Sequence, residues 1–202
     1  MSVVEIALFV CTLFTLFTFM ISIVWSTLVS GISPMPSSRK ARQAMLQMVN
    51  DIDCQIVTDI DSGPIFELGS GWGNLLIPLA KKYPQRKIVG YELSVMPWLT
   101  TLILKKLHGL SNITLYRKNF LFADISSATI ILCYLYPAGM QKIENKIESK
   151  IKSKIKSKTE AQCDQLHYLI SNNFALPLRR PIKIIQIDDI YKSPIYLYQF
   201  KW

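Results

Sequence analysis

The sequence predicts an α/β protein with a mostly parallel sheet that ends in an antiparallel edge hairpin, preceded by one N-terminal transmembrane helix. Three observations support this fold class. An uncharged, apolar run follows Glu5, strand-like segments alternate with helical ones after residue 60, and a glycine-rich turn joins the first strand to the first helix. Such alternation indicates βαβ units, whose helices cover both faces of a parallel sheet.

The composition excludes several classes of protein. The 202 residues are 50% hydrophobic and carry a formal net charge of +9. A disordered chain would combine its charge with low hydrophobicity, so this chain is expected to fold. The cysteines are far apart, with no CxxC pair, which argues against a disulfide scaffold or a zinc module and indicates buried or free thiols in a reducing compartment. They are Cys11, Cys54, Cys133 and Cys163.

Residues 6–29 form the apolar run and predict the transmembrane helix. A bilayer core requires about 20 apolar residues, and Trp25 stands where an interfacial aromatic residue is expected. A cleaved signal peptide would have a basic start and a shorter apolar core, whereas this segment opens with MSVVE. Arg39, Lys40 and Arg42 follow the run, so the positive-inside rule predicts a single-pass protein with everything downstream on the cytoplasmic or matrix side.

The chain then divides into a predicted anchor (1–31), a linker with an N-terminal helix (32–60) and an α/β domain (61–202). Ser37 or Ser38 is expected to cap a helix over residues 39–50. The predicted strands are PIFELGSG, KIVGYEL, NITLYRKN, ATIILCYL, HYLISNNFAL, PIKIIQI and PIYLYQF, and the segments LLIPLAKKY and PWLTTLILKKLHGL are predicted helices, the second closed by Gly109.

Residues 142–158 (KIENKIESKIKSKIKSK) are the one low-complexity stretch. Isoleucine recurs every fourth residue, which predicts a helix with one apolar stripe. The lysines either form a solvated face above a stripe packed on the sheet, or they contact anionic lipid or an acidic partner. The sequence leaves both readings open.

The turn Glu67-Leu68-Gly69-Ser70-Gly71-Trp72-Gly73 carries most of the functional information. Its E-x-G-x-G-x-G pattern differs from the G-x-G-x-x-G of nicotinamide-binding loops. It resembles the first motif of class I S-adenosylmethionine-dependent methyltransferases. The next predicted strand ends at Glu92, where an acidic residue in a doubly wound sheet binds ribose hydroxyls.

The resemblance implies S-adenosylmethionine as the cofactor. The residues expected to bind it are Glu67, Gly69, Ser70, Gly71, Gly73, Glu92 and Leu93, with Asn119 at the adenine amino group and Phe120 against the base.

The chain as a whole resembles the small membrane-anchored lysine methyltransferases of the ATP synthase c-subunit and the adenine nucleotide translocase. The resembling features are Pro34 and Pro36, the loop ELGSGWG, GYEL followed by Pro97-Trp98-Leu99, the segment ATIILCYLYPAGM, and residues 170–177 (ISNNFALP). The resemblance implies a seven-stranded, Rossmann-like sheet. It also implies methyl transfer to a lysine of a substrate that is itself a membrane protein.

Such a transfer depends mainly on placing a neutral amine in line with the methyl group. Tyr134, Tyr136 and Asn172 are the expected substrate-positioning residues, near Phe174, because aromatic rings hold ammonium groups by cation–π contact. Plain packing under a helix is the alternative for the two tyrosines. Cys133 lies within an apolar strand and is expected in the core. No metal site is predicted.

Three alternatives remain. A lipid or a lipophilic small molecule is a different acceptor for the same chemistry. The basic composition suggests nucleic-acid methylation as a second alternative. However, the fourth strand ends in Leu-Tyr-Pro and lacks the Asn-Pro-Pro-Tyr common among such enzymes, so nucleic acid is not an expected partner. The third alternative is a degenerate, non-catalytic membrane scaffold. The intact loop glycines and Glu92 argue against it.

Overall fold

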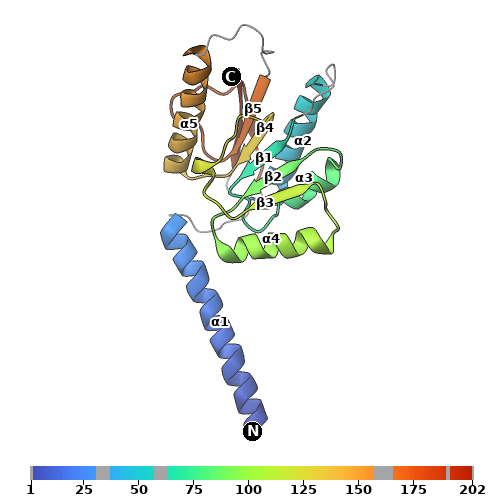
Figure 1. Cartoon of the computed structure of the whole chain (residues 1–202), viewed down its shortest axis with the longest axis vertical. Helices are drawn as coiled ribbons and strands as arrows, with labels where there is room; N and C mark the ends of the chain where they lie inside the picture. Colours follow the sequence, from blue (N-terminus) through green and yellow to red (C-terminus); the bar gives the residue numbers. More distant parts are fainter. Residues whose placement is uncertain (1, 31–36, 57–62, 157–165, 190–191, 202) are drawn as a thin grey trace. The chain divides into compact units, whose positions relative to one another are not determined.

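The computed structural model describes residues 2–30, 37–56, 63–156, 166–189 and 192–201, shown in Figure 1. Side chains at 19, 22–30, 55, 56 and 154–156 also lie outside the description. The chain divides into two compact units, Met1–Met35 and Pro36–Trp202. We describe each unit separately.

The second unit is built on a seven-stranded sheet in the order β3-β2-β1-β4-β5-β7-β6. All pairs from β3 to β5 are parallel, whereas β7 runs antiparallel to both β5 and β6. This arrangement confirms the predicted seven-stranded α/β sheet with its antiparallel edge hairpin. The strands are β1 (Ile65–Leu68), β2 (Ile88–Tyr91), β3 (Ile113–Tyr116), β4 (Ile130–Cys133), β5 (Leu166–Asn172), β6 (Lys183–Gln186) and β7 (Pro194–Lys201).

Helices cover both faces of this sheet, as Figure 1 shows for α2 and α3 on one side and α5 on the other. Every residue of β1, β2 and β4 is buried, as expected of parallel strands between two helical layers. The two layers make separate apolar cores, one under α2 and α3 and one under α5. The helices of this unit are α2 (Arg39–Ile56), α3 (Leu76–Lys82), α4 (Val95–Leu107), the short 3₁₀ helix η1 (Phe120–Phe122) and α5 (Pro137–Lys156).

Helix α2 begins as predicted and continues further than predicted. Ser38 is its cap, because the Ser38 hydroxyl accepts a hydrogen bond from the backbone N–H of Ala41 (3.1 Å). Met45 and Met48 are buried, and Ile52 is also buried, one turn beyond Met48. This additional buried turn explains why the helix extends past residue 50.

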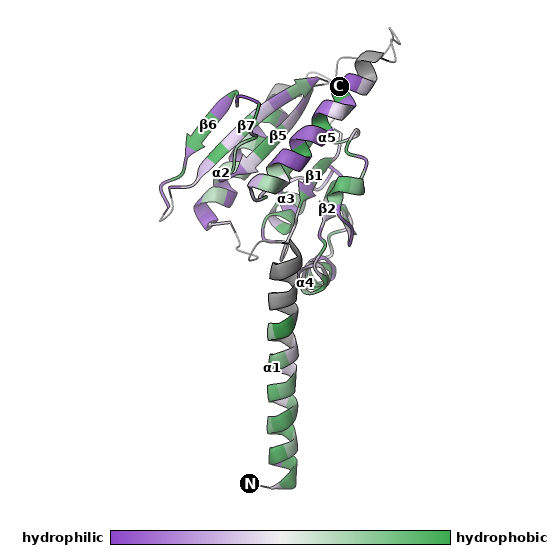
Figure 2. Ribbon diagram, turned by 90° about the vertical axis from the view of Figure 1, so that its left-hand side faces the viewer, coloured by the Kyte–Doolittle hydropathy of each residue, from purple (hydrophilic) through white to green (hydrophobic). Residues whose placement is uncertain are grey.

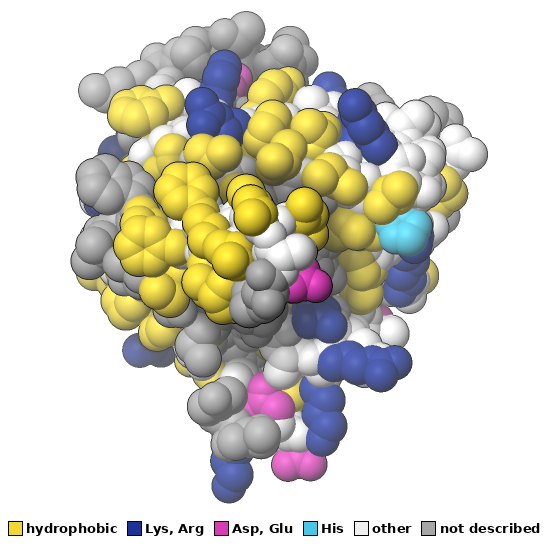
Figure 3. Space-filling model, turned by 90° about the horizontal axis from the view of Figure 1, so that it is seen from below, with side chains coloured by type: hydrophobic (Ala, Val, Ile, Leu, Met, Phe, Trp, Pro, Cys, Tyr) yellow, Lys and Arg dark blue, Asp and Glu magenta, His cyan; other side chains and the backbone are white. Residues whose placement is uncertain are grey.

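Helix α4 ends at the predicted glycine, where Gly109 has a φ of +61°. Its inner side buries Thr101, while its outer side exposes apolar side chains at a spacing of four residues. These are Val95, Leu99, Ile103 and Leu107. Figure 3 shows hydrophobic side chains on the surface of the protein.

The first unit contains α1 (Val3–Ser30), which Figure 2 shows as mainly hydrophobic over its described part. Ser2 and Glu5 form a reciprocal cap at its start. Threonine hydroxyls of this helix donate to carbonyls about one turn earlier, for example Thr12 to Leu8 (2.7 Å) and Thr18 to Phe14 (3.0 Å).

The predicted membrane span is not supported. Among the described residues, no helix has both the length and the apolar character that crossing a membrane requires. This finding corrects the predicted transmembrane anchor and the single-pass localisation on the cytoplasmic or matrix side. Lipid contact through residues 6–29 has no support either.

The lysine-rich segment forms α5 over the part that the structure describes. Ile143 and Ile147 are fully buried against the sheet and Ile151 is partly buried, which confirms the predicted apolar stripe. Ile155 lies outside the described side chains. The stripe packs on the core, as expected from the first of the two interpretations of this segment, in which the isoleucines lie on the sheet.

Candidate functional site

The glycine-rich turn lies at the carboxyl end of β1 and is pinned to the neighbouring strand. The backbone N–H groups of Gly69 and Ser70 both donate to the carbonyl of Tyr91, at 2.8 and 2.9 Å. Gly69, Gly71 and Gly73 all have positive φ. The turn therefore folds back over the end of β2 before α3 begins.

Two of these glycines have different structural roles. At Gly73, with φ at +77°, an added Cβ would lie 2.9 Å from the side chain of Thr101. At Gly71, an added Cβ would meet nothing within 4 Å. Gly73 thus permits the turn to pack against α4, whereas Gly71 borders open space where a ligand could approach the backbone.

Glu92 directly follows β2, and its carboxylate connects two loops. One oxygen accepts the N–H of Gly71 (2.8 Å) and the other accepts the N–H of Ser94 (2.7 Å). The sequence-predicted pair of glycine loop and acidic residue is therefore brought together. Each carboxylate oxygen has a further lone pair, so Glu92 could also accept hydrogen bonds from ribose hydroxyls.

Two buried polar atoms beside the loop have no hydrogen-bond partner in the described part of the chain. They are one carboxylate oxygen of Glu67 and the hydroxyl of Ser70. Burial, and secondarily the charge of Glu92, raise the pKa of Glu67 well above its usual value. Buried groups of this kind normally have partners. They fit a ligand that brings hydroxyl groups and positive charge, as S-adenosylmethionine does.

The other residues expected at the cofactor lie at the ends of β2 and β3. Leu93 is exposed. The side-chain oxygen of Asn119 accepts the N–H of Leu121 (3.0 Å) and thereby caps η1. Phe120 is partly buried against the core beneath α5. The oxygen of Asn119 retains a second lone pair for an adenine amino group.

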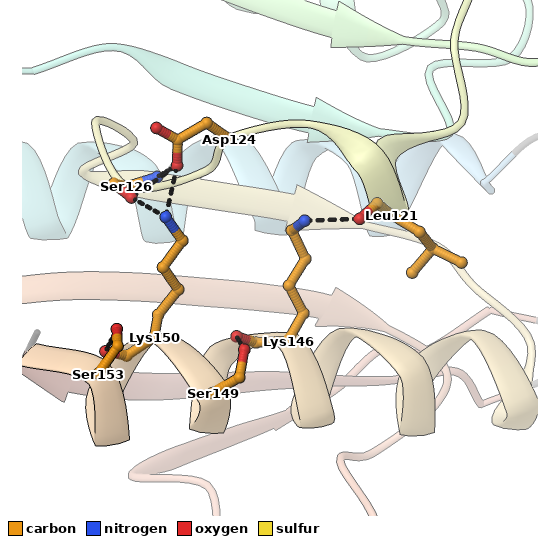
Figure 4. Close-up of polar contacts among 7 residues, drawn as sticks. All are labelled: Leu121, Asp124, Ser126, Lys146, Ser149, Lys150 and Ser153. Carbon is orange, nitrogen blue, oxygen red and sulfur yellow. Dashed lines mark hydrogen bonds and ion pairs between the residues drawn. The ribbon is translucent and has the colours of Figure 1, made fainter.

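Two lysines of α5 hold the loop that carries Phe120, as Figure 4 shows. The amino group of Lys146 donates to the carbonyl of Leu121 (2.6 Å). Lys150 pairs with Asp124 (2.8 Å) and donates to the hydroxyl of Ser126 (2.7 Å). Burial lowers the pKa of Lys146. Nothing in the sequence pattern separated these two lysines from the others in the segment.

The expected acceptor side lies beyond β4. The ring of Tyr134 stacks on that of Phe174, with centroids 6.3 Å apart and planes at 18°. The ring of Tyr136 lies instead beside Gly139, where an added Cβ would meet it at 3.3 Å. Cys133 is buried as predicted, and burial raises its pKa to about 12, so it remains a thiol.

Asn172 is the last residue of β5 and is 3% exposed. Its side-chain NH₂ donates to the hydroxyl of Ser37 (3.0 Å). The sequence predicts Ser37 only as a possible helix cap, and no local pattern indicates this contact. Glu144 on α5 was not predicted as a functional residue either, although an acid inside an isoleucine stripe is a detectable signal. Its carboxylate is fully buried and accepts the N–H of Leu178.

No group of three or more His, Cys, Asp or Glu side chains in the described ranges could hold a metal ion. The site therefore consists of a backbone loop, carboxylates, an amide and aromatic rings. Such groups bind and orient a ligand.

Comparison with protein families identifies one matching domain. The model of the ANTKMT methyltransferase domain matches residues 67–183, which is more than half of the chain. The matched range begins at Glu67 and includes Glu92, Tyr134 and Asn172. No curated protein sequence matches the chain.

Solved structures share the fold at low sequence identity. An RNA methyltransferase from Salinibacter ruber, in complex with S-adenosylhomocysteine, is 19% identical with a TM-score of 0.62, over 82% of this chain and 93% of that one. The Escherichia coli protein yhhF is 10% identical with a TM-score of 0.55, over 82% and 88%. A point mutant of MtNAS, in complex with S-adenosylmethionine, is 10% identical with a TM-score of 0.53, over 77% and 61%. At these identities the likeness concerns the fold.

Proposed function

Because the chain belongs to the ANTKMT methyltransferase domain family and is an S-adenosylmethionine-dependent methyltransferase, we propose that it methylates the side-chain amine of a lysine in a protein substrate. The observation that carries the proposal is the family match over residues 67–183. This range joins the cofactor loop to the aromatic edge beyond β4, so both halves of the proposed site belong to the matched domain.

In this proposal the cofactor is held by Glu67, Ser70 and Glu92. The unpartnered oxygen of Glu67 and the hydroxyl of Ser70 face a ligand with polar and cationic groups, and Glu92 accepts from the ribose. Bound S-adenosylmethionine supplies a methyl carbon made electrophilic by the attached sulfonium. The loop glycines bring the backbone close to the ligand without a Cβ in the way.

The chain's contribution on the acceptor side is to desolvate and orient the amine. Lysine must lose its proton before it can attack, and burial lowers the pKa of a lysine amine. The stacked rings of Tyr134 and Phe174 offer a π face to an ammonium group that enters or leaves. Positioning a neutral amine in line with the methyl carbon accounts for most of the rate enhancement in a reaction of this kind.

The test uses an extract, with its membrane fraction, from cells that lack this protein. The purified full-length enzyme and methyl-labelled S-adenosylmethionine are added, and label is followed into protein, lipid and nucleic acid. We expect discrete labelled protein bands whose acid hydrolysate contains methylated lysine. Glu92→Ala should remove the label, because the variant loses the carboxylate that holds Gly71. The surface variant Glu148→Ala serves as the control.

Each other outcome contradicts the proposal in a different way. Label only in the lipid fraction would identify a lipid or lipophilic acceptor. Label only in nucleic acid would identify a base methyltransferase. Absence of label together with absence of cofactor binding would mean that the glycine loop is a relic in a non-catalytic protein.

A further inference from the structure

The contact between Ser37 and Asn172 joins two segments that are 135 residues apart in the sequence. Asn172 ends β5, and its amide has two chemically different ends. The NH₂ group donates to the hydroxyl of Ser37 at 3.0 Å. The amide oxygen is buried and, within the described part of the chain, has no hydrogen-bond partner.

A buried, unpartnered amide oxygen is unfavourable, because it loses its hydrogen bonds to water and gains none from the protein. The strand register places it beside the site. Leu68 on β1 pairs with Cys133 on β4, which pairs with Ser171 on β5. Asn172 therefore lies one residue beyond this level, at the edge where the glycine loop and Tyr134 also begin. Adjacent strands are about 4.8 Å apart, so β5 lies roughly 10 Å from β1.

The direction of the side chain follows from strand alternation. Tyr168 and Ile170 pack in the core beneath α2. Asn172 continues this alternation and points toward the same side, where Ser37 precedes α2. A donor supplied by a ligand at the carboxyl edge would satisfy the amide oxygen there.

Ser37 is itself held in place. Its carbonyl accepts a hydrogen bond from the guanidinium of Arg42 (2.5 Å). The next residue, Ser38, caps α2 and donates to Asp189 (2.8 Å), between β6 and β7. A fixed hydroxyl that binds the NH₂ end of Asn172 determines which end of the amide remains free, and here it is the oxygen.

We propose that Ser37 is a positioning residue for methyl transfer: it orients Asn172 so that the amide oxygen accepts a hydrogen bond from the acceptor amine. This inference rests on the proposed function. A neutral amide oxygen suits the task, since a carboxylate there would stabilise the protonated amine. In the transfer, the amine nitrogen bonds to the methyl carbon while the carbon–sulfur bond breaks. The electron pair leaves on sulfur, and the excess proton passes from nitrogen to water.

The first experiment compares neighbouring serines. Ser37→Ala should lower kcat/KM for the acceptor about tenfold, the effect of one lost orienting hydrogen bond, while cofactor affinity stays unchanged. Ser37→Thr keeps a hydroxyl and should restore most of the activity. Ser38→Ala removes a helix cap and should lower the melting temperature without changing kcat/KM of the folded enzyme. Equal losses of kcat/KM in both alanine variants would overturn the proposal.

Two substitutions at Asn172 provide further readouts. Asn172→Asp should move the pH optimum upward, because the carboxylate keeps the amine protonated. Asn172→Leu should abolish transfer yet lower the melting temperature by no more than about 4 °C, since it loses only the hydrogen bond to Ser37 and the amide oxygen has no partner to lose. An unmoved pH profile, or a large fall in melting temperature, would assign the amide a structural role and overturn the proposal.

These results separate the two hypotheses. If label enters lipid or nucleic acid, the proposed function fails, and the serine pair is compared on that acceptor instead. If no acceptor is labelled at all, the melting temperature of Asn172→Leu still decides whether the amide is structural.

Discussion

The two halves of the carboxyl edge of the sheet differ in how the chain builds them. On the cofactor half, the contact between Gly71 and Glu92 spans 21 residues and joins two consecutive βα turns. On the acceptor half, Asn172 meets Ser37 across 135 residues. The first half is a local motif, whereas the second is assembled by tertiary packing. The following predictions test whether this difference extends to energetics.

The largest effect is expected at the centre of the cofactor half. Glu92→Ala removes the acceptor for two backbone N–H groups and, in the proposed site, for the ribose. Hydrogen bonds to a charged group contribute about 1.5–3 kcal/mol each, so we expect the affinity for S-adenosylmethionine to fall about a thousandfold. Calorimetric titration measures this change, with Glu148→Ala as the control. Affinity within threefold of the wild type would show that the loop, and not the carboxylate, holds the cofactor.

The backbone of the same half provides the next test. Gly73→Ala forces an L residue into a φ of +77° and brings its Cβ to 2.9 Å from Thr101. Together these effects should lower the free energy of unfolding by about 2–4 kcal/mol. Gly109→Ala shares the positive φ but has open space, so it should cost only about 1 kcal/mol. Urea denaturation of the two variants separates crowding from backbone strain, and equal losses would exclude crowding.

The sequence was sufficient to predict the contacts of the cofactor half but not those of the acceptor half. Apolar and β-branched segments predicted all seven strands. The signal is strongest for β1, β2 and β4, which are buried along their whole length. The proximity of Gly71 and Glu92 followed from parallel strand order. The Ser37 contact did not, since no local pattern encodes a pairing over 135 residues. The span predicted from hydropathy over residues 6–29 is not supported either, since the described residues contain no helix with the length and apolar character of a membrane crossing.

A smaller effect is expected at Glu67, where a substitution should increase the free energy of unfolding. Burial raises its pKa in the folded protein above the unfolded value of about 4.3. Its contribution to stability is therefore complete below about pH 4 and is lost as pH rises toward the folded pKa. Glu67→Gln removes this loss and should increase the free energy of unfolding at pH 7 by about 1–3 kcal/mol.

The same variant should bind S-adenosylmethionine more weakly, which is a trade-off between stability and function. Urea denaturation of both proteins between pH 4 and 7 should show a difference that grows with pH. A Glu67→Gln protein that is less stable than the wild type at pH 7 would mean that the carboxylate has a structural partner.

On the acceptor half, two tyrosines lie in different environments. Tyr134 stacks on Phe174, whereas Tyr136 packs beside Gly139. If the ring of Tyr134 contacts an ammonium group, Tyr134→Leu should raise KM for the acceptor about fivefold and Tyr134→Phe should not, since a cation–π contact contributes about 1 kcal/mol. Tyr136→Leu is the matched control and should leave KM unchanged. Similar KM values for all three variants would remove Tyr134 from the acceptor site.

The smallest effect concerns the two lysines of α5 that hold the loop carrying Phe120 (Figure 4). Lys150→Met removes the ion pair with Asp124, whose side chain is 73% exposed. An exposed pair contributes about 0.2–1 kcal/mol, so stability should fall by no more than this and cofactor affinity by about threefold. Lys142→Met, an exposed position on the same helix, is the control.

The pH dependence identifies the cause of this last effect. The hydrogen bond from Lys150, with those from Ser126, lowers the pKa of Asp124 below its usual value. The stabilisation is therefore present above the unfolded pKa of about 3.9 and is lost as pH falls through the lower folded value. The stability difference between Lys150→Met and the wild type should disappear in strong acid and shrink at high salt. A difference that persists under both conditions would come from packing of the lysine methylenes on the loop, and the loop would then be held without electrostatics.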